Sequence, residues 1–143
     1  MISALIHAKI FAEYLNKCDS RYIVHIALKE IGIPSDCDGF QYAKNAVIML
    51  DQNRYATLSN GVYPAVGLLR NPPAGEGQVD SAMRWAISSA WENRNMEIWH
   101  YYFPVGTAGV TRCPSNREFL LAIVDFVELW KGCCEEVNYG KRS

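Results

Sequence analysis

Hydrophobic residues recur with a helical period between Gln78 and Trp91, in the segment QVDSAMRWAISSAW. Apolar residues spaced i, i+3, i+4 and i+7 bury one face of a helix. Here they are Val79, Ala82, Met83, Ala86, Ile87, Ala90 and Trp91. The other face carries Gln78, Asp80, Ser81, Arg84, Trp85 and Ser88. A short helix, a turn and such a helix form the reading surface of a helix-turn-helix, although similar helix pairs also serve only to close a core.

The same period predicts helices through the N-terminal half of the chain. Residues 1–18 are expected to form an amphipathic helix, and Asp19-Ser20 is the N-cap signal of a second helix that ends at Gly32. A third helix is expected over residues 39–50. In the apolar segment 55–69 we expect a break near residues 61–64, because the internal proline there would cost a regular helix ~3 kcal/mol.

In the C-terminal half, residues 96–102 are predicted to form a short aromatic helix, followed by a loop over 105–113. Ser115 and Glu118 have the spacing of a capping box, directly before the apolar run FLLAIVDFVELW. This last helix is predicted to lie in the core, with a dimer interface as the alternative. No segment alternates like a strand, so we expect an all-α single domain of six or seven helices that contains a helix-turn-helix.

Composition narrows the choice of partners. The chain has 143 residues, half of them apolar, a net charge of −1 and a pI near 6.3, so any nucleic-acid contact must use a local basic patch. No apolar run approaches the ~20 residues that cross a bilayer, and the N-terminus does not resemble a signal peptide. Scattered cysteines without a Cys-x-x-Cys pair predict neither a disulfide framework nor a metal site, and we expect a cytoplasmic protein without a membrane partner. They are Cys18, Cys37, Cys113, Cys133 and Cys134.

The candidate catalytic groups do not form a known arrangement. His7, His25 and His100 are isolated from one another, and His25 and His100 are interpreted as core or edge residues. The sequence contains no glycine-rich phosphate loop, H-E-x-x-H or G-x-S-x-G motif. We therefore predict neither an enzyme nor a cofactor.

Four segments match one known family in order and approximate spacing from residue 22 to residue 131. They are IGIPSDCDGFQYAKNAVIML, the Tyr63-Pro64 step, VDSAMRWAISSAWENRN and PSNREFLLAIVDFVEL. Together they resemble the C-terminal effector domain of the sporulation initiation response regulator of endospore-forming Firmicutes. The resemblance implies an effector domain over residues 19–131, preceded by the helix 1–18 and followed by a tail, 132–143. The helix after Tyr63-Pro64 would then be the recognition helix.

The resemblance also implies partners and contacts. The family binds promoter DNA through the recognition helix, often as a tandem dimer, and its full-length members carry a phosphoacceptor receiver domain, for which this chain leaves no room. Two differences from the family stand out: the turn 71–77 is about two residues longer, and the recognition helix is less basic. The implied recognition-helix contacts are Gln78, Asp80, Ser81, Arg84 and Trp85. The candidate phosphate contacts are Lys44, Arg54, Arg70 and Arg112.

Two functions follow from these observations. One is a DNA-binding transcriptional regulator without its own phosphoacceptor domain, controlled by expression, oligomerisation or a partner. The alternative is a paralogue that does not bind DNA and acts by protein–protein contact, as a homodimer or as a mixed dimer with a related regulator. An exposed tryptophan often anchors protein contacts, so Trp85 favours the second function, whereas the helix-turn-helix spacing favours the first.

Overall fold

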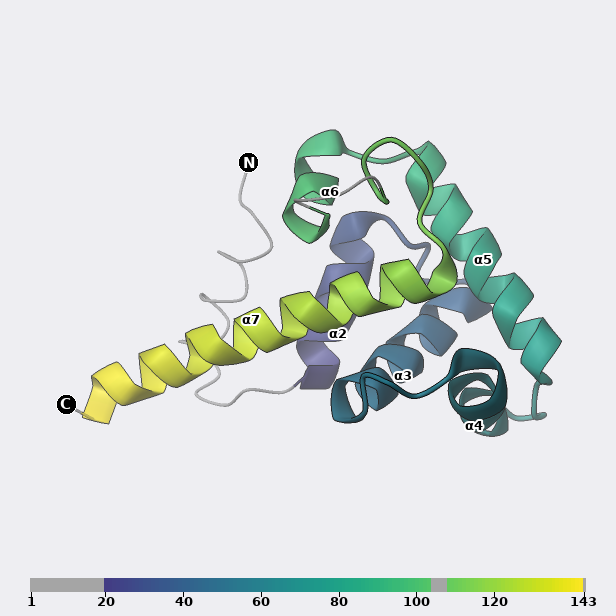
Figure 1. Cartoon of the computed structure of the whole chain (residues 1–143), viewed down its shortest axis with the longest axis horizontal. Coiled ribbons are helices and arrows are strands. Elements are labelled where there is room, and N and C mark those ends of the chain that lie inside the picture. Colours follow the sequence, from purple (N-terminus) through teal and green to yellow (C-terminus); the bar gives the residue numbers. More distant parts are fainter. Residues whose placement is uncertain (1–19, 104–107, 143) are drawn as a thin grey trace.

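The computed structural model describes residues 20–103 and 108–142, and in this part of the chain it is helical and contains no strand (Figure 1). The predicted helix over residues 1–18 lies outside the described residues. The elements are α2 (Ser20–Ile31), α3 (Asp38–Gln52), the π-helical turn η1 (Leu58–Val62), α4 (Tyr63–Leu68), α5 (Glu76–Glu92), α6 (Met96–Tyr102) and α7 (Asn116–Arg142). The predicted all-α fold is confirmed.

Helix α3 lies at the centre of the core, in contact with α2, α4, α5 and α7. Its inward residues Phe40, Ala43 and Val47 are fully buried because they recur at helical spacing on one face. Gly39 lets α3 and α5 approach closely, since a Cβ at this position would lie 2.6 Å from the carbonyl oxygen of Ala82. The contact between α3 and α5 therefore fixes where α5 stands on the surface of the domain.

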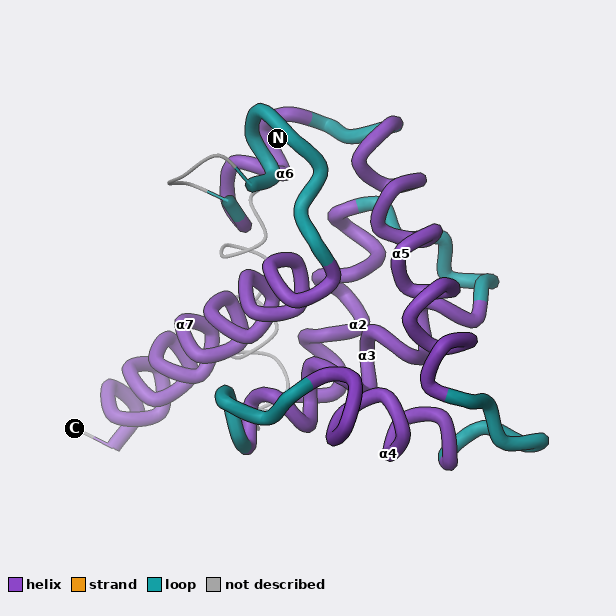
Figure 2. Tube along the Cα trace, turned by 45° about the vertical axis from the view of Figure 1, so that its right-hand side comes forward, coloured by secondary structure: helices purple, strands orange, loops and turns teal. Residues whose placement is uncertain are grey.

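The predicted helix-turn-helix consists of α4, the turn 69–75 and α5 (Figure 2). The expected break near Pro64 takes the form of a change from π-helix to α-helix at Tyr63, with Pro64 in the first turn of α4, where its missing N–H costs nothing. At the other end of α4, the Gly67 carbonyl accepts a hydrogen bond from the Ala74 N–H at 2.9 Å. A Cβ at Gly67 would lie 2.1 Å from the Ala74 carbonyl oxygen, so this tight turn requires glycine.

Helix α7 begins with the predicted capping box. The Glu118 N–H donates to the Ser115 hydroxyl at 3.1 Å, and the Ser115 N–H donates to the Glu118 carboxylate at 3.0 Å. The apolar face of α7, which includes Phe119, Ile123 and Trp130, is buried in the core, as predicted. The helix continues unbroken through residue 132 to Arg142, and its C-terminal half projects from the rest of the domain in Figure 1.

Candidate nucleic-acid interface

The outward face of α5 presents polar and aromatic side chains to solvent. Gln78 and Ser81 are exposed, the Arg84 side chain is 69% exposed and Trp85 is 59% exposed. Beneath them the apolar residues of α5 are buried against α3, α4 and α7. They are Val79, Met83, Ala86, Ile87 and Ala90. The helical period alone therefore explains why the predicted recognition residues share one accessible face.

Asp80 occupies a different position from the other predicted contacts. It lies at the edge of that face, with its side chain only 29% exposed. Its Oδ2 atom accepts from Arg84 at 2.6 Å, and its Oδ1 atom accepts from the Asn116 amide at 3.0 Å. Both carboxylate oxygens are thus engaged within the protein. In this arrangement Asp80 orients Arg84, and each of its carboxylate oxygens already accepts a hydrogen bond from within the protein.

Asn116 connects three elements of the site. It is buried at the start of α7, and its amide also donates to the Tyr63 hydroxyl of α4 at 3.0 Å and to the Asp80 main-chain carbonyl of α5 at 3.2 Å. Burial raises the pKa of Tyr63 above its ordinary value, so its hydroxyl remains protonated near neutral pH. This network holds the helix-turn-helix and α7 in a fixed relation.

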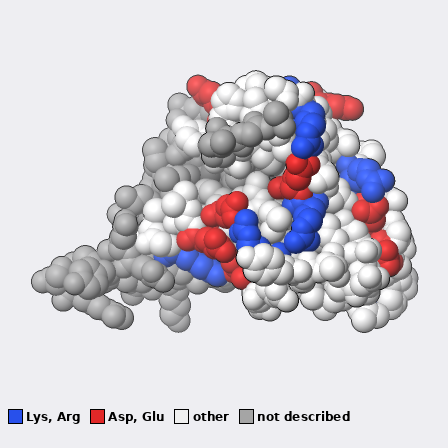
Figure 3. Space-filling view, in the orientation of Figure 1, with Lys and Arg blue, Asp and Glu red and all other residues white. Residues whose placement is uncertain are grey.

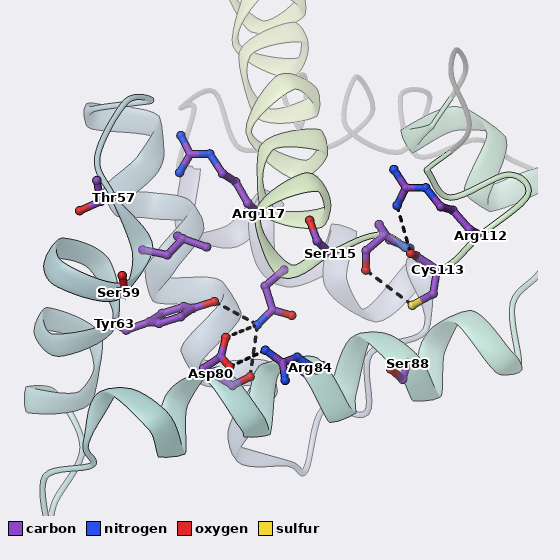
Figure 4. A pocket seen from close by; sticks show the side chains of 13 residues that line it. Thr57, Ser59, Tyr63, Asp80, Arg84, Ser88, Arg112, Cys113, Ser115 and Arg117 are labelled. Atoms are coloured by element: carbon purple, nitrogen blue, oxygen red, sulfur yellow. Dashed lines mark hydrogen bonds and ion pairs between the residues drawn. The ribbon is translucent and has the colours of Figure 1, made fainter.

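A groove of about 830 Å³ lies between α5, the η1–α4 segment and the start of α7 (Figure 4). Three arginines line it: Arg84 from α5, Arg112 from the loop before α7 and Arg117 from the first turn of α7. The remaining lining residues are Thr57, Leu58, Ser59, Tyr63, Asp80, Ser88, Cys113, Pro114, Ser115 and Asn116. Because Asp80, Arg84 and Ser88 are one helical turn apart, one edge of α5 forms a wall of this groove.

Carboxylates neutralise most of the cations near this site. Arg84 pairs with Asp80, and Arg112 forms a bidentate pair with Glu118 at 2.9 and 2.6 Å. Hydrogen bonding to Arg112 lowers the pKa of Glu118 to about 2. In Figure 3, acidic and basic side chains alternate, and the visible face shows no broad positive surface. Any nucleic acid would therefore have to compete with intramolecular ion pairs.

Only one of the four predicted phosphate contacts lies in the groove. Arg112 lines it, whereas Arg54 forms an ion pair with Asp125 of α7 at 2.6 Å. Arg70 sits beside α3, 3.3 Å from Asp38. Lys44 lies near His25 on the α2 side of α3. Arg54, Arg70 and Lys44 thus do not converge with Arg112 around α5, because they belong to other faces of the domain.

Arg117 lines the groove although it is not among the residues predicted from the sequence. Its guanidinium donates to the main-chain carbonyls of Ala56 at 3.1 Å and Arg54 at 3.2 Å. Among the described residues it has no carboxylate partner, in contrast to Arg84 and Arg112. Its position in the sequence could have indicated this role. Arg117 lies two residues after the N-cap Ser115, in the first turn of a helix, and neighbouring segments pack around such a turn.

The described histidines considered for catalysis lie apart from each other, on α2 and α6. His25 packs edge-on against Phe40, with ring centroids 5.1 Å apart, and burial lowers its pKa. His100 is exposed on α6, and His7 lies outside the described residues. Within the described ranges, no group of three His, Cys, Asp or Glu side chains could hold a metal ion. None of the described helices is long and apolar enough to span a membrane.

Comparison with known families identifies the fold. The family described as "Sporulation initiation factor Spo0A C terminal" matches residues 24–127. The chain belongs to this family. The match covers α2 to the first three turns of α7, and therefore includes the helix-turn-helix and the whole groove. The resemblance found from the sequence is confirmed, because the matched family is that of the sporulation regulator's C-terminal effector domain.

Proposed function

We propose that this protein is a transcriptional regulator that binds double-stranded promoter DNA by inserting α5 into the major groove. The observation that carries the proposal is the outward face of α5, on which Gln78, Ser81 and Arg84 are exposed while the opposite face is locked into the core. A helix supported in this way fits the ≈ 12 Å width of the B-DNA major groove.

The exposed side chains have the chemistry of base recognition. Glutamine pairs with the N6 and N7 atoms of adenine, and arginine pairs with O6 and N7 of guanine. Serine forms hydrogen bonds with either base. The ion pair with Asp80 occupies the Nη2 atom of Arg84, so a guanine contact that uses both Nη atoms has to displace this carboxylate. Trp85 adds an apolar surface that can contact a thymine methyl group.

The distribution of charge sets the expected strength of binding. Affinity for DNA rises with the number of phosphates that cationic side chains neutralise. Because Arg84, Arg112, Arg54 and Arg70 are each paired with a carboxylate, few cations are available without breaking an ion pair. We therefore expect weaker binding than that of a basic effector domain, and a loss of binding at moderate salt.

Fluorescence polarisation on labelled duplexes tests the proposal. Duplexes enriched from a randomised library would be compared with scrambled duplexes of equal length, at low and at moderate salt. Arg84→Ala is expected to remove about 1–3 kcal/mol of discrimination between the two, as for a bidentate guanine contact. Lys29→Ala, in the last turn of α2, removes the same charge away from α5 and is expected to leave the discrimination unchanged. Equal binding of both duplexes by the wild-type protein would contradict sequence-selective recognition.

The second candidate function is protein–protein contact, favoured by the exposure of Trp85. An aromatic side chain that is 59% exposed is a common anchor of interfaces. In this case the wild-type protein would bind no duplex even at low salt. Trp85→Ala would then abolish dimerisation with itself or with a related regulator, measured by analytical ultracentrifugation. An unchanged sedimentation profile for Trp85→Ala would exclude this use of the residue.

A further inference from the structure

The groove beside α5 contains a cation that the proposed contacts of α5 do not use. Arg117 is held by two main-chain carbonyls, those of Ala56 and Arg54, and forms no ion pair with a described carboxylate. Two hydrogen bonds leave other N–H groups of its guanidinium available, because arginine has five. The positive charge of Arg117 is therefore available to an external anion, and the two hydrogen bonds fix the position of its guanidinium.

The surroundings of Arg117 suit a phosphodiester backbone. The groove also presents the hydroxyl-bearing side chains of Thr57, Ser59 and Ser115, which with backbone groups and arginines are the usual partners of DNA phosphates. The capping box already occupies the Ser115 and Glu118 N–H groups, so these two groups are not available to an anion. The Arg117 guanidinium and the Thr57 and Ser59 hydroxyl groups remain as donors, because the Ser115 side chain is engaged with Glu118.

The position of the groove indicates which anion it receives. One wall is the Asp80–Arg84–Ser88 edge of α5, directly beside the face that we assign to the bases. When a helix lies in the major groove, the two DNA backbones run along its two sides. The strand on the α7 side would therefore pass along this groove, which Figure 4 shows with Arg84 of α5 and Arg117 of α7 among its lining residues.

We infer that this groove seats the phosphate backbone of one DNA strand and that Arg117 is a sequence-independent phosphate contact. The inference rests on the proposed function, because it assumes that α5 enters the major groove. It assigns a separate role to α7: Arg117 would supply affinity and register, whereas Gln78, Ser81 and Arg84 would supply selectivity.

The salt dependence of binding separates these roles. Each phosphate neutralised contributes about 0.9 to the slope of log K against log salt concentration for duplex DNA. Arg117→Gln is therefore expected to make this negative slope shallower by about 0.9, so that the fall in affinity between 50 and 200 mM salt becomes about 3.5-fold smaller. The change should be the same on selected and scrambled duplexes. Arg117→Lys keeps the charge and should keep the slope, and Lys29→Gln in α2 is the matched control.

Because the Arg117 guanidinium also donates to the main-chain carbonyl of Arg54, circular dichroism must show that the Arg117→Gln variant is folded. If it is not, Ser59→Glu places a carboxylate in the groove at an exposed residue and should weaken binding to both duplexes. Gln41→Glu adds the same charge to the exposed surface of α3 and should not. Equal affinities for these two variants would overturn the inference.

The possible outcomes distinguish this inference from the proposed function. No duplex binding by the wild-type protein would refute both. Selective binding by the wild-type protein, with a wild-type slope for folded Arg117→Gln, would overturn the role of the groove and leave the role of α5 intact. Free inorganic phosphate presents the same anionic oxygens to the groove as the DNA backbone does. If it shifts the groove amides in NMR spectra while DNA does not, the groove binds a free anion and the inference is wrong.

Discussion

Removing the carboxylate of Asp80 should strengthen DNA binding. In the free protein, Asp80 holds the Arg84 guanidinium at 2.6 Å, and a bound base must compete with this ion pair. Asp80→Asn keeps the size of the side chain and leaves an amide oxygen that can still accept from Asn116, so the buried network is preserved. The main interaction lost is the ion pair with Arg84, and the charge of Asp80 beside the Tyr63 hydroxyl is removed with it.

The exposure of the pair sets the size of the effect. The Arg84 side chain is 69% exposed and that of Asp80 is 29% exposed, so the pair belongs to the surface class worth about 0.2–1 kcal/mol. If DNA binding no longer has to overcome this attraction, affinity should rise between about 1.4-fold and fivefold. The free energy of unfolding should fall by no more than the same amount.

Fluorescence polarisation with a double-mutant cycle measures this effect. The Asp80→Asn gain should disappear in an Arg84→Ala background, because no guanidinium is then released. Glu97→Gln on α6 changes the net charge equally and provides the control for long-range attraction. A gain of the same size in Glu97→Gln, or a gain that persists without Arg84, would refute the reasoning that Asp80 competes with DNA for Arg84.

Three further predictions concern stability. Gly39→Ala should lower the free energy of unfolding, measured in urea, by about 1–3 kcal/mol, because its Cβ would lie 2.6 Å from a carbonyl oxygen of α5. Gly77→Ala is the control and should not be destabilising, because a Cβ there meets nothing within 4 Å. Glu118→Gln should cost at most about 1 kcal/mol at neutral pH, since the exposed pair with Arg112 is screened by solvent. Because the pKa of Glu118 is lowered to about 2 in the folded protein, the stability that its ion pair contributes is present above the ordinary pKa of glutamate and is lost as pH falls toward 2. If the destabilisation by Glu118→Gln does not shrink over this pH range, the ion pair with Arg112 is not its cause. Trp85→Ala should change the free energy of unfolding by less than about 0.5 kcal/mol in thermal melts, because the side chain is largely exposed, and a loss above ~1 kcal/mol would show that it supports the core.

The sequence predicted the elements well because helix periodicity is local information. The helices expected over 39–50, 78–91 and 96–102 are observed as α3, α5 and α6, with ends that differ by at most two residues. The capping box located the start of α7 for the same reason: its two hydrogen bonds join residues only three apart. The exposure of Gln78, Ser81, Arg84 and Trp85 also follows from the period of a single helix.

Contacts between distant residues could not be predicted in this way. Arg54 pairs with a carboxylate 71 positions away, and the Asp80–Asn116 hydrogen bond joins residues 36 positions apart. Such distances in sequence carry no periodic signal, so the sequence alone predicts Arg54 and Asp80 to be available to DNA. Arg117 was missed for the same reason, because its place in the groove depends on how α7 packs beside the η1–α4 segment.

An NMR titration of the labelled protein with a selected duplex tests the central claim most directly. The claim predicts that DNA shifts the amide resonances of residues 78–88 on α5, together with those of the groove at Ser115–Arg117. A scrambled duplex should shift the groove resonances and leave those of α5 less affected. Shifts confined to other surfaces, such as the exposed Leu68 and Leu69 at the end of α4, would contradict the assignment of α5 as the recognition helix.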